Sequence, residues 1–155
     1  MKFTIFFISI LVLFNCKESK KQTYEPTAVV HQQEIQDHQG EKLMKMYCYA
    51  CHDATTPEDK RLAPPMVAIK RRYITKNTRK EDFVKDMQNW VKNPSEEKAK
   101  MYGAVQRFGI MVKMGYAYED IKAIAEYMYD HELEKPDWFE EHYQRGMGRC
   151  KKSNP

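Results

Sequence analysis

Two cysteines and a histidine stand together in the segment Cys48-Tyr49-Ala50-Cys51-His52. Residues three apart on a helical turn lie on the same side, so both thiols can face one cleft with His52 pointing into it. This spacing is typical of c-type haem attachment, in which two thioether bonds hold the macrocycle and the histidine ligates the iron. The motif therefore predicts one covalently bound haem c per chain, with Cys48, Cys51 and His52 as its attachment site.

Other proteins use paired cysteines for different chemistry. A thioredoxin-like redox pair needs a surrounding βαβ pattern, which this sequence lacks. A structural zinc site needs a fourth ligand and usually a second paired motif, which is also missing from the sequence. A plain disulfide or a buried pair is a third alternative. The spacing favours haem over these non-haem alternatives, which stay open at this point.

The N-terminus has the pattern of an export signal. Met1-Lys2 gives a positive start, and residues 3–14 are apolar except for Thr4 and Ser9. About twelve residues are too few to span a bilayer, but they fit the apolar region of a secretory signal. We therefore expect residues 1–15 to be a signal peptide and the protein to lie in the periplasm or on the outer side of a bacterial membrane.

Cys16 directly follows this apolar run and precedes a charged stretch at 17–21. Its place resembles the lipobox of bacterial lipoproteins, which implies that Cys16 becomes the acylated first residue of the mature chain. An export signal with an incidental cysteine is the alternative. The rest of 16–38 is polar and has no sustained hydrophobic periodicity, so we expect a tether between a lipid anchor and the domain.

Length and composition allow one ordinary domain. The chain has 155 residues, of which 42% are hydrophobic and 31% are charged, with a formal net charge of +4. This excess is too small and too dispersed to indicate nucleic-acid binding. Four cysteines are too few for a disulfide scaffold. No paired carboxylates, phosphate-binding glycine loop or nucleophile–base pattern stands out, so we do not expect an enzyme of these classes.

Amphipathic patterns predict the helices that must position the motif. One apolar face recurs with helical spacing at Phe83, Val84, Met87, Trp90 and Val91. Thr78 and Glu81 have capping-box spacing before that helix, and Asn93-Pro94 should end it. A second helix carries its apolar face at Ile121, Ile124, Ala125 and Met128.

Together these motifs resemble class I monohaem c-type cytochromes over residues 39–134. The segment 40–44 precedes Cys48 as the first helix does in that family, and Ala63-Pro64-Pro65-Met66 is similar to its Gly-Pro-x-Leu segment. The resemblance implies an all-α, cytochrome c-like fold with three main helices around the haem. It also implies that the first and last helices cross near Gly40 and Tyr127, and that the Pro64 carbonyl accepts a hydrogen bond from His52.

The resemblance also implies a distal iron ligand from the loop at 108–115. In the family this methionine stands about ten residues before the first buried aliphatic residue of the last helix, as Met111 stands before Ile121. We expect Met111 to be the ligand, with Met114 as the competing candidate. Trp90 is either a hydrogen-bond donor to a haem propionate or a core indole.

Residues 135–155 lie beyond the resemblance. Pro136 should start a short extra helix, followed by a loose basic tail from Gly146. Trp138 and Phe139 are either cover for the core or an exposed docking patch. Cys150 has no evident partner in the sequence.

The implied function is one-electron transfer by a carrier that is not an enzyme. Its partners would be redox proteins such as a membrane oxidase, reductase or dehydrogenase. A haem enzyme or gas sensor with an open distal site is the alternative within haem proteins.

Overall fold

The computed structural model describes Ile35 and residues 39–152. The predicted signal peptide, Cys16 and almost all of the tether lie outside the described residues. Every regular element in the described part is helical, which confirms the all-α prediction. None of the helices in this part is both long and apolar enough to span a membrane.

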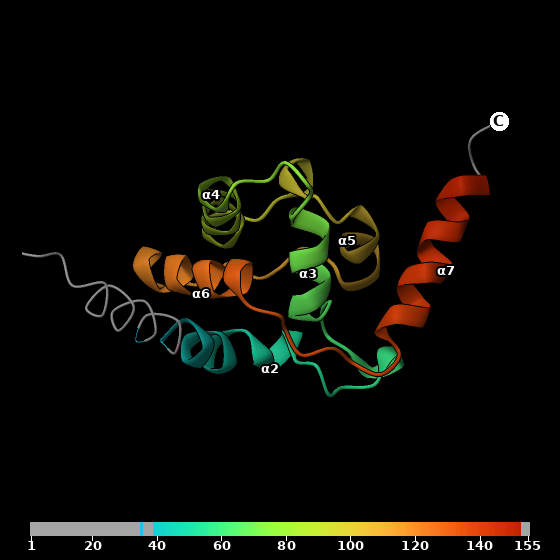
Figure 1. The fold of residues 1–155 in the computed structure, drawn as a ribbon, viewed down its shortest axis with the longest axis horizontal. Helices are drawn as coiled ribbons and strands as arrows, with labels where there is room; N and C mark the ends of the chain where they lie inside the picture. The colour runs from blue at the N-terminus through green and yellow to red at the C-terminus, as the bar shows by residue number, and fades with distance from the viewer. Residues whose placement is uncertain (1–34, 36–38, 153–155) are drawn as a thin grey trace, which may run out of the picture.

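A helical segment at 39–47 runs through Cys48 into the short α2, and four further helices build the domain before α7 extends from it (Figure 1). The helices are α2 (Tyr49–His52), α3 (Met66–Tyr73), α4 (Lys80–Lys92), α5 (Tyr102–Phe108), α6 (Tyr118–Asp130) and α7 (Phe139–Lys152). Two 3₁₀ turns, η1 (Glu58–Lys60) and η2 (Glu96–Lys98), lie in the connections.

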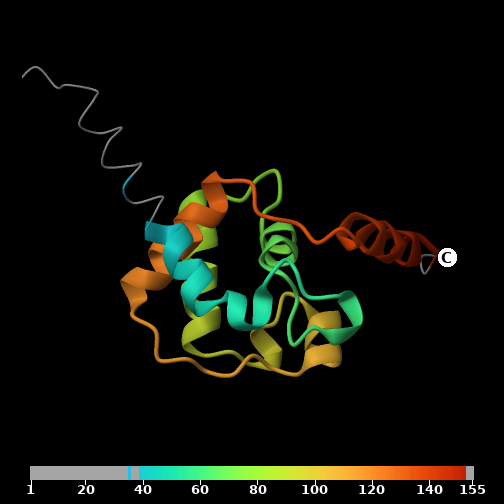
Figure 2. The same cartoon turned by 90° about the horizontal axis from the view of Figure 1, so that it is seen from below.

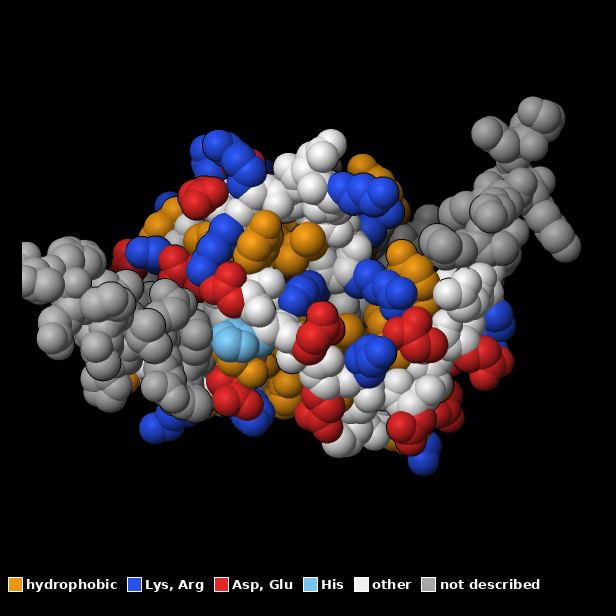
Figure 3. Space-filling view, viewed as in Figure 1, with side chains coloured by type: hydrophobic (Ala, Val, Ile, Leu, Met, Phe, Trp, Pro, Cys, Tyr) orange, Lys and Arg blue, Asp and Glu red, His pale blue; other side chains and the backbone are white. Residues whose placement is uncertain are grey.

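The core forms where α4, α6 and the segment 39–47 meet, which Figure 2 shows from below. Each contributes side chains that are almost completely buried: Met44, Phe83, Ile124 and Met128. The periodic faces predicted for the two longer helices are therefore the faces that are buried, except that Trp90 is only half-buried. Positive and negative side chains mix on the face shown in Figure 3, in keeping with the small net charge.

Gly40 lies where the first helical segment crosses α6. A Cβ atom placed on it would come within 2.4 Å of the Ala123 carbonyl oxygen and 2.6 Å of the Tyr127 Cβ. Both distances are far shorter than a carbon contact allows, so the two helices approach this closely only because residue 40 has no side chain. The expected crossing at Gly40 and Tyr127 is confirmed.

The predicted capping box at the start of α4 is wrong. α4 begins at Lys80, and its N-cap, Arg79, makes no side-chain cap hydrogen bond. The Thr78 hydroxyl instead accepts the backbone amide of Thr75 at 2.9 Å, so a tighter turn just before the helix uses it. The predicted end is confirmed, because α4 stops at Lys92 with Asn93 as its C-cap.

The C-terminal extension is longer and more ordered than predicted. Its helix, α7, starts at Phe139 and continues to Lys152, where a loose tail was expected from Gly146. Phe139 is 2% exposed and joins the core, so it serves as core cover. The Arg71 guanidinium lies over the Phe139 ring at 5.6 Å and the Tyr143 ring at 3.9 Å, which fixes the start of α7 on α3.

Gly40→Ala tests the close helix crossing. We expect it to lower the free energy of unfolding by about 1–3 kcal/mol, because the methyl group must push α6 away. The matched control is Gly103→Ala in α5, where nothing lies within 4 Å of the added Cβ. That control should gain up to about 1 kcal/mol of helix propensity. Urea unfolding followed by circular dichroism measures both, and equal stability of the two variants would contradict the crossing.

Candidate functional site

A cavity of about 300 Å³ brings together residues from five parts of the chain. This size lies at the lower end of the roughly 300–1,000 Å³ typical of small-molecule sites. All the residues predicted for the cofactor and the iron line it: Cys48, Cys51, His52, Pro64, Trp90, Met111 and Met114. Most of the remaining lining is apolar and comes from α3, α4, α5 and the loop before α6. Only Cys16 among the predicted site residues lies outside the described residues.

The two cysteines reach the cavity from one helical turn. The backbone amide of His52 donates to the Cys48 carbonyl at 2.8 Å, which keeps Cys48, Cys51 and His52 within one helical turn. Both thiols are free. Burial raises the pKa of Cys48 to about 12, so this sulfur is held as a neutral thiol, whereas Cys51 is exposed. Among the described residues, no three His, Cys, Asp or Glu side chains are grouped to hold a metal ion by themselves.

His52 is oriented by one backbone carbonyl. Its Nδ1 lies 2.6 Å from the Pro64 oxygen. A carbonyl only accepts, so Nδ1 carries the proton and Nε2 keeps its lone pair. Burial lowers the pKa of His52, which keeps the ring neutral at pH 7. The arrangement leaves the Nε2 lone pair available, so this nitrogen could bind a metal ion.

The loop between His52 and Pro64 is closed by two side chains that sequence reasoning missed. The Asp53 carboxylate accepts the backbone amides of Thr55 at 2.7 Å and Thr56 at 2.6 Å. An Asp two and three residues before such amides is typical of an Asx turn, a signal present in the sequence. Arg61 is 7% exposed and donates to backbone carbonyls of the same loop. No sequence pattern marks Arg61 for this role.

The loop between α5 and α6 also lines the cavity. Gly109, at its start, has φ of +79°, a conformation that favours glycine. Near its end the Tyr116 ring stacks on Tyr47 with centroids 4.5 Å apart, and its hydroxyl donates to the Tyr47 carbonyl at 3.1 Å. The loop is thus attached beside Cys48.

Both candidate methionines of this loop line the cavity, but their surroundings differ. Met111 is half-buried and packs against the core. Met114 is 40% exposed. Met111 is therefore the thioether that the protein holds in place.

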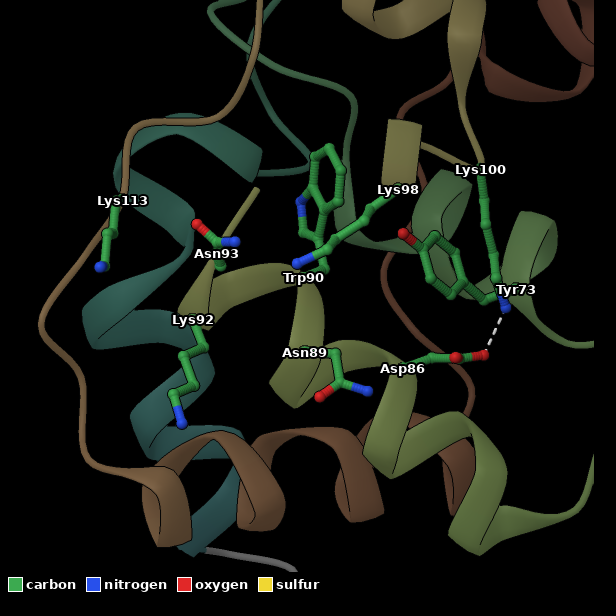
Figure 4. Close-up of a pocket in the computed structure, with 9 residues that line it drawn as sticks. All are labelled: Tyr73, Asp86, Asn89, Trp90, Lys92, Asn93, Lys98, Lys100 and Lys113. Carbon is green, nitrogen blue, oxygen red and sulfur yellow. Dashed lines mark hydrogen bonds and ion pairs between the residues drawn. The ribbon is translucent and has the colours of Figure 1, made fainter. Parts of the chain in front are cut away.

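One end of the cavity is polar. Tyr73, Trp90 and Lys100 line both this cavity and a neighbouring hollow of about 790 Å³ (Figure 4). The side chains that line the neighbouring hollow in the described part include four lysines and one carboxylate, Asp86, which pairs with Lys100. Burial raises the pKa of Tyr73 to about 12, so its phenol stays a hydrogen-bond donor at neutral pH. The apolar cavity thus opens into a cationic region at Trp90.

Comparisons with known proteins add nothing to this geometry. No family model matches the chain, and no curated protein or solved structure matches it significantly. A functional assignment therefore depends on what the residues around the cavity can do.

Proposed function

We propose that the protein is an exported, lipid-anchored one-electron carrier with a cytochrome c-like fold and one covalently bound haem c. Cys48 and Cys51 would form the thioethers, and His52 and Met111 would be the axial iron ligands. One observation carries the proposal. A single, mostly apolar cavity is lined by the two thiols, by the imidazole and by a thioether from a loop about sixty residues away.

The cavity also suits the amphipathic character of haem. Haem is a flat apolar macrocycle with two carboxylates, so its site needs an apolar interior and one polar, preferably cationic, end. The lining is mostly apolar, and Tyr73 and Trp90 supply donors where the cavity meets the second hollow. Lys100 there pairs with Asp86, and the positive charge comes from the three other lysines of that hollow, Lys92, Lys98 and Lys113. These residues support the assignment of Trp90 as a propionate partner.

When bound, haem supplies an iron centre that gains and loses one electron. The chain's own residues would set the conditions for that exchange. His52 provides a neutral nitrogen whose orientation is set by Pro64, and a soft thioether from Met111 favours the reduced state. Stacking of Tyr116 on Tyr47 keeps the methionine loop closed over the cavity. Ligands on both faces leave no position for a substrate, which favours a carrier over a haem enzyme or gas sensor.

The cavity reaches the surface, as exchange with another protein requires. Leu62 and Val112 both line it, and they are 70% and 75% exposed. A redox protein such as a membrane oxidase, reductase or dehydrogenase would exchange electrons across this apolar rim.

Cys51→Ala and His52→Ala test the cofactor. We expect each to abolish stable holoprotein, because the macrocycle would fill the cavity between α3, α4 and the loop before α6. Haem staining on denaturing gels and a reduced-minus-oxidised spectrum of the exported protein measure the outcome. Cys150→Ala is the matched control and should keep both signals. A normal yield of helical, haem-free protein from the motif variants would contradict the proposal.

Met111→Ala tests the distal ligand. It should remove the sulfur-to-iron charge-transfer band of the ferric spectrum, lower the midpoint potential and let the ferrous protein bind carbon monoxide. Met114→Ala is the control and should keep the band, since Met114 is 40% exposed whereas Met111 packs against the core.

If the band is lost in Met114→Ala and kept in Met111→Ala, Met114 is the ligand. Retention of the band in both variants would exclude a methionine of this loop as ligand. Rapid binding of carbon monoxide by the reduced wild-type protein would instead favour the gas-sensor or enzyme alternative.

Cys16→Ser tests the anchor. The variant should move from the membrane fraction to the soluble periplasmic fraction with an unchanged haem spectrum, because acylation provides the membrane affinity. Cell fractionation followed by haem staining measures this, with Cys150→Ser as control. Unchanged membrane association of Cys16→Ser would point to an uncleaved signal or a protein partner as the anchor.

A further inference from the structure

Arg61 joins the two ends of the loop that separates His52 from Pro64. Its Nη2 donates to the carbonyl of Asp53, the residue after His52. Its Nε donates to the carbonyl of Ala63, the residue before Pro64, at 3.1 Å. One guanidinium therefore holds the two backbone positions on which the His52–Pro64 hydrogen bond depends.

The chemistry of the side chain suits this role. Arg61 also donates through Nη1 to the Thr56 carbonyl at 2.8 Å, so three carbonyls share one planar, buried guanidinium. The five donors of arginine are fixed in a fork, whereas a lysine ammonium is a compact point charge that does not match three separate acceptors in one plane. The Asp53 carboxylate attracts the guanidinium electrostatically, while the three hydrogen bonds go to backbone carbonyls of one loop. These directional bonds point to a role in fixing the loop geometry rather than only in packing.

The C-terminal extension covers this guanidinium. The centre of the Trp138 ring lies 5.4 Å from the guanidinium carbon of Arg61, in cation–π contact. Trp138 in turn contacts the His142 ring of α7 at 5.7 Å. His142 also bonds Glu58 Oε1 through Nδ1 at 2.7 Å, so α7 is attached to the same loop at a second point.

We propose that Arg61, closed in by Trp138, is a positioning residue that keeps the Pro64 carbonyl at Nδ1 of His52. Its redox consequence depends on the proposed function. A hydrogen bond from Nδ1–H to a carbonyl makes Nε2 a stronger electron donor, which favours ferric iron. Loosening this bond should therefore raise the midpoint potential. The C-terminal extension thus acts on the proximal ligand without touching it.

Arg61→Lys is the first test, because it keeps the positive charge and loses the fork. Exchange of the His52 Nδ1–H with solvent, followed by ¹⁵N–¹H NMR of the reduced holoprotein, should accelerate on the order of tenfold, as expected for loss of one hydrogen bond. The rate is taken relative to the amide of Ile124 in α6, which corrects for global stability. The midpoint potential should rise in the same variant.

Arg107→Lys is the matched control. Arg107 donates to the Glu58 carbonyl at 2.6 Å in the same loop, but not to Asp53 or Ala63. It should change neither readout. Trp138→Leu should shift both readouts in the direction of Arg61→Lys, and Trp138→Phe should restore them, so the test holds even if Arg61→Lys does not fold.

The inference is overturned if Arg61→Lys and Trp138→Leu leave the relative exchange rate of the Nδ1–H at its wild-type value, or if Arg107→Lys accelerates it equally. A chain purified without haem would refute the proposed function. The exchange measurement on that haem-free chain would still decide the role of Arg61.

Discussion

The hydrogen bond between His52 Nδ1 and the Pro64 carbonyl constrains the part of the cavity lining that carries Cys48, Cys51 and His52. It joins the end of α2 to the start of α3 across a loop of eleven residues, and it selects the tautomer that leaves Nε2 free. α3 begins two residues after the acceptor, at Met66, with the Ala68 amide donating to the carbonyl of the N-cap Pro65 at 2.9 Å. The position of α3, and of the buried Met66 at its start, therefore depends on the same loop closure.

The loop between α5 and α6 meets a different demand, because a segment without regular secondary structure must be held in place beside the cavity. Ordering such a chain costs roughly 1–2 kcal/mol per residue. Tyr116 offsets part of this cost at one point, through its ring on Tyr47 and its hydroxyl on the Tyr47 carbonyl. The Tyr47 hydroxyl donates in turn to Asp120 in the first turn of α6 at 3.2 Å. Tyr47, the residue before Cys48, therefore fixes the loop next to the helical segment 39–47.

The sequence allowed prediction of the features that depend on hydrophobic periodicity within a helix and on the spacing of residues in a motif. The buried faces of α4 and α6 follow from residues such as Phe83 and Ile124, and the cavity contains every cofactor residue predicted in the described part. Features that depend on which of two hydrogen bonds a side chain makes, or on contacts formed only in the folded loop, were missed. Thr78 was expected to cap α4, but its hydroxyl accepts the backbone amide of Thr75 instead. The role of Arg61 depends on carbonyls whose positions only the folded loop defines.

Tertiary contacts hold the start of α7 on the domain. The tail from Gly146 is basic and was expected to be loose, and Gly146 and Gly148 each lower helix propensity by roughly 1 kcal/mol. Burial of Phe139 at the start of α7 contributes about 2 kcal/mol or more, whereas the pair of Arg71 with Glu140 is exposed to solvent and contributes little. Apolar burial therefore supplies most of the attachment. Because salt screens exposed charges and leaves apolar burial largely intact, the cover of Trp138 over Arg61 should persist at high ionic strength.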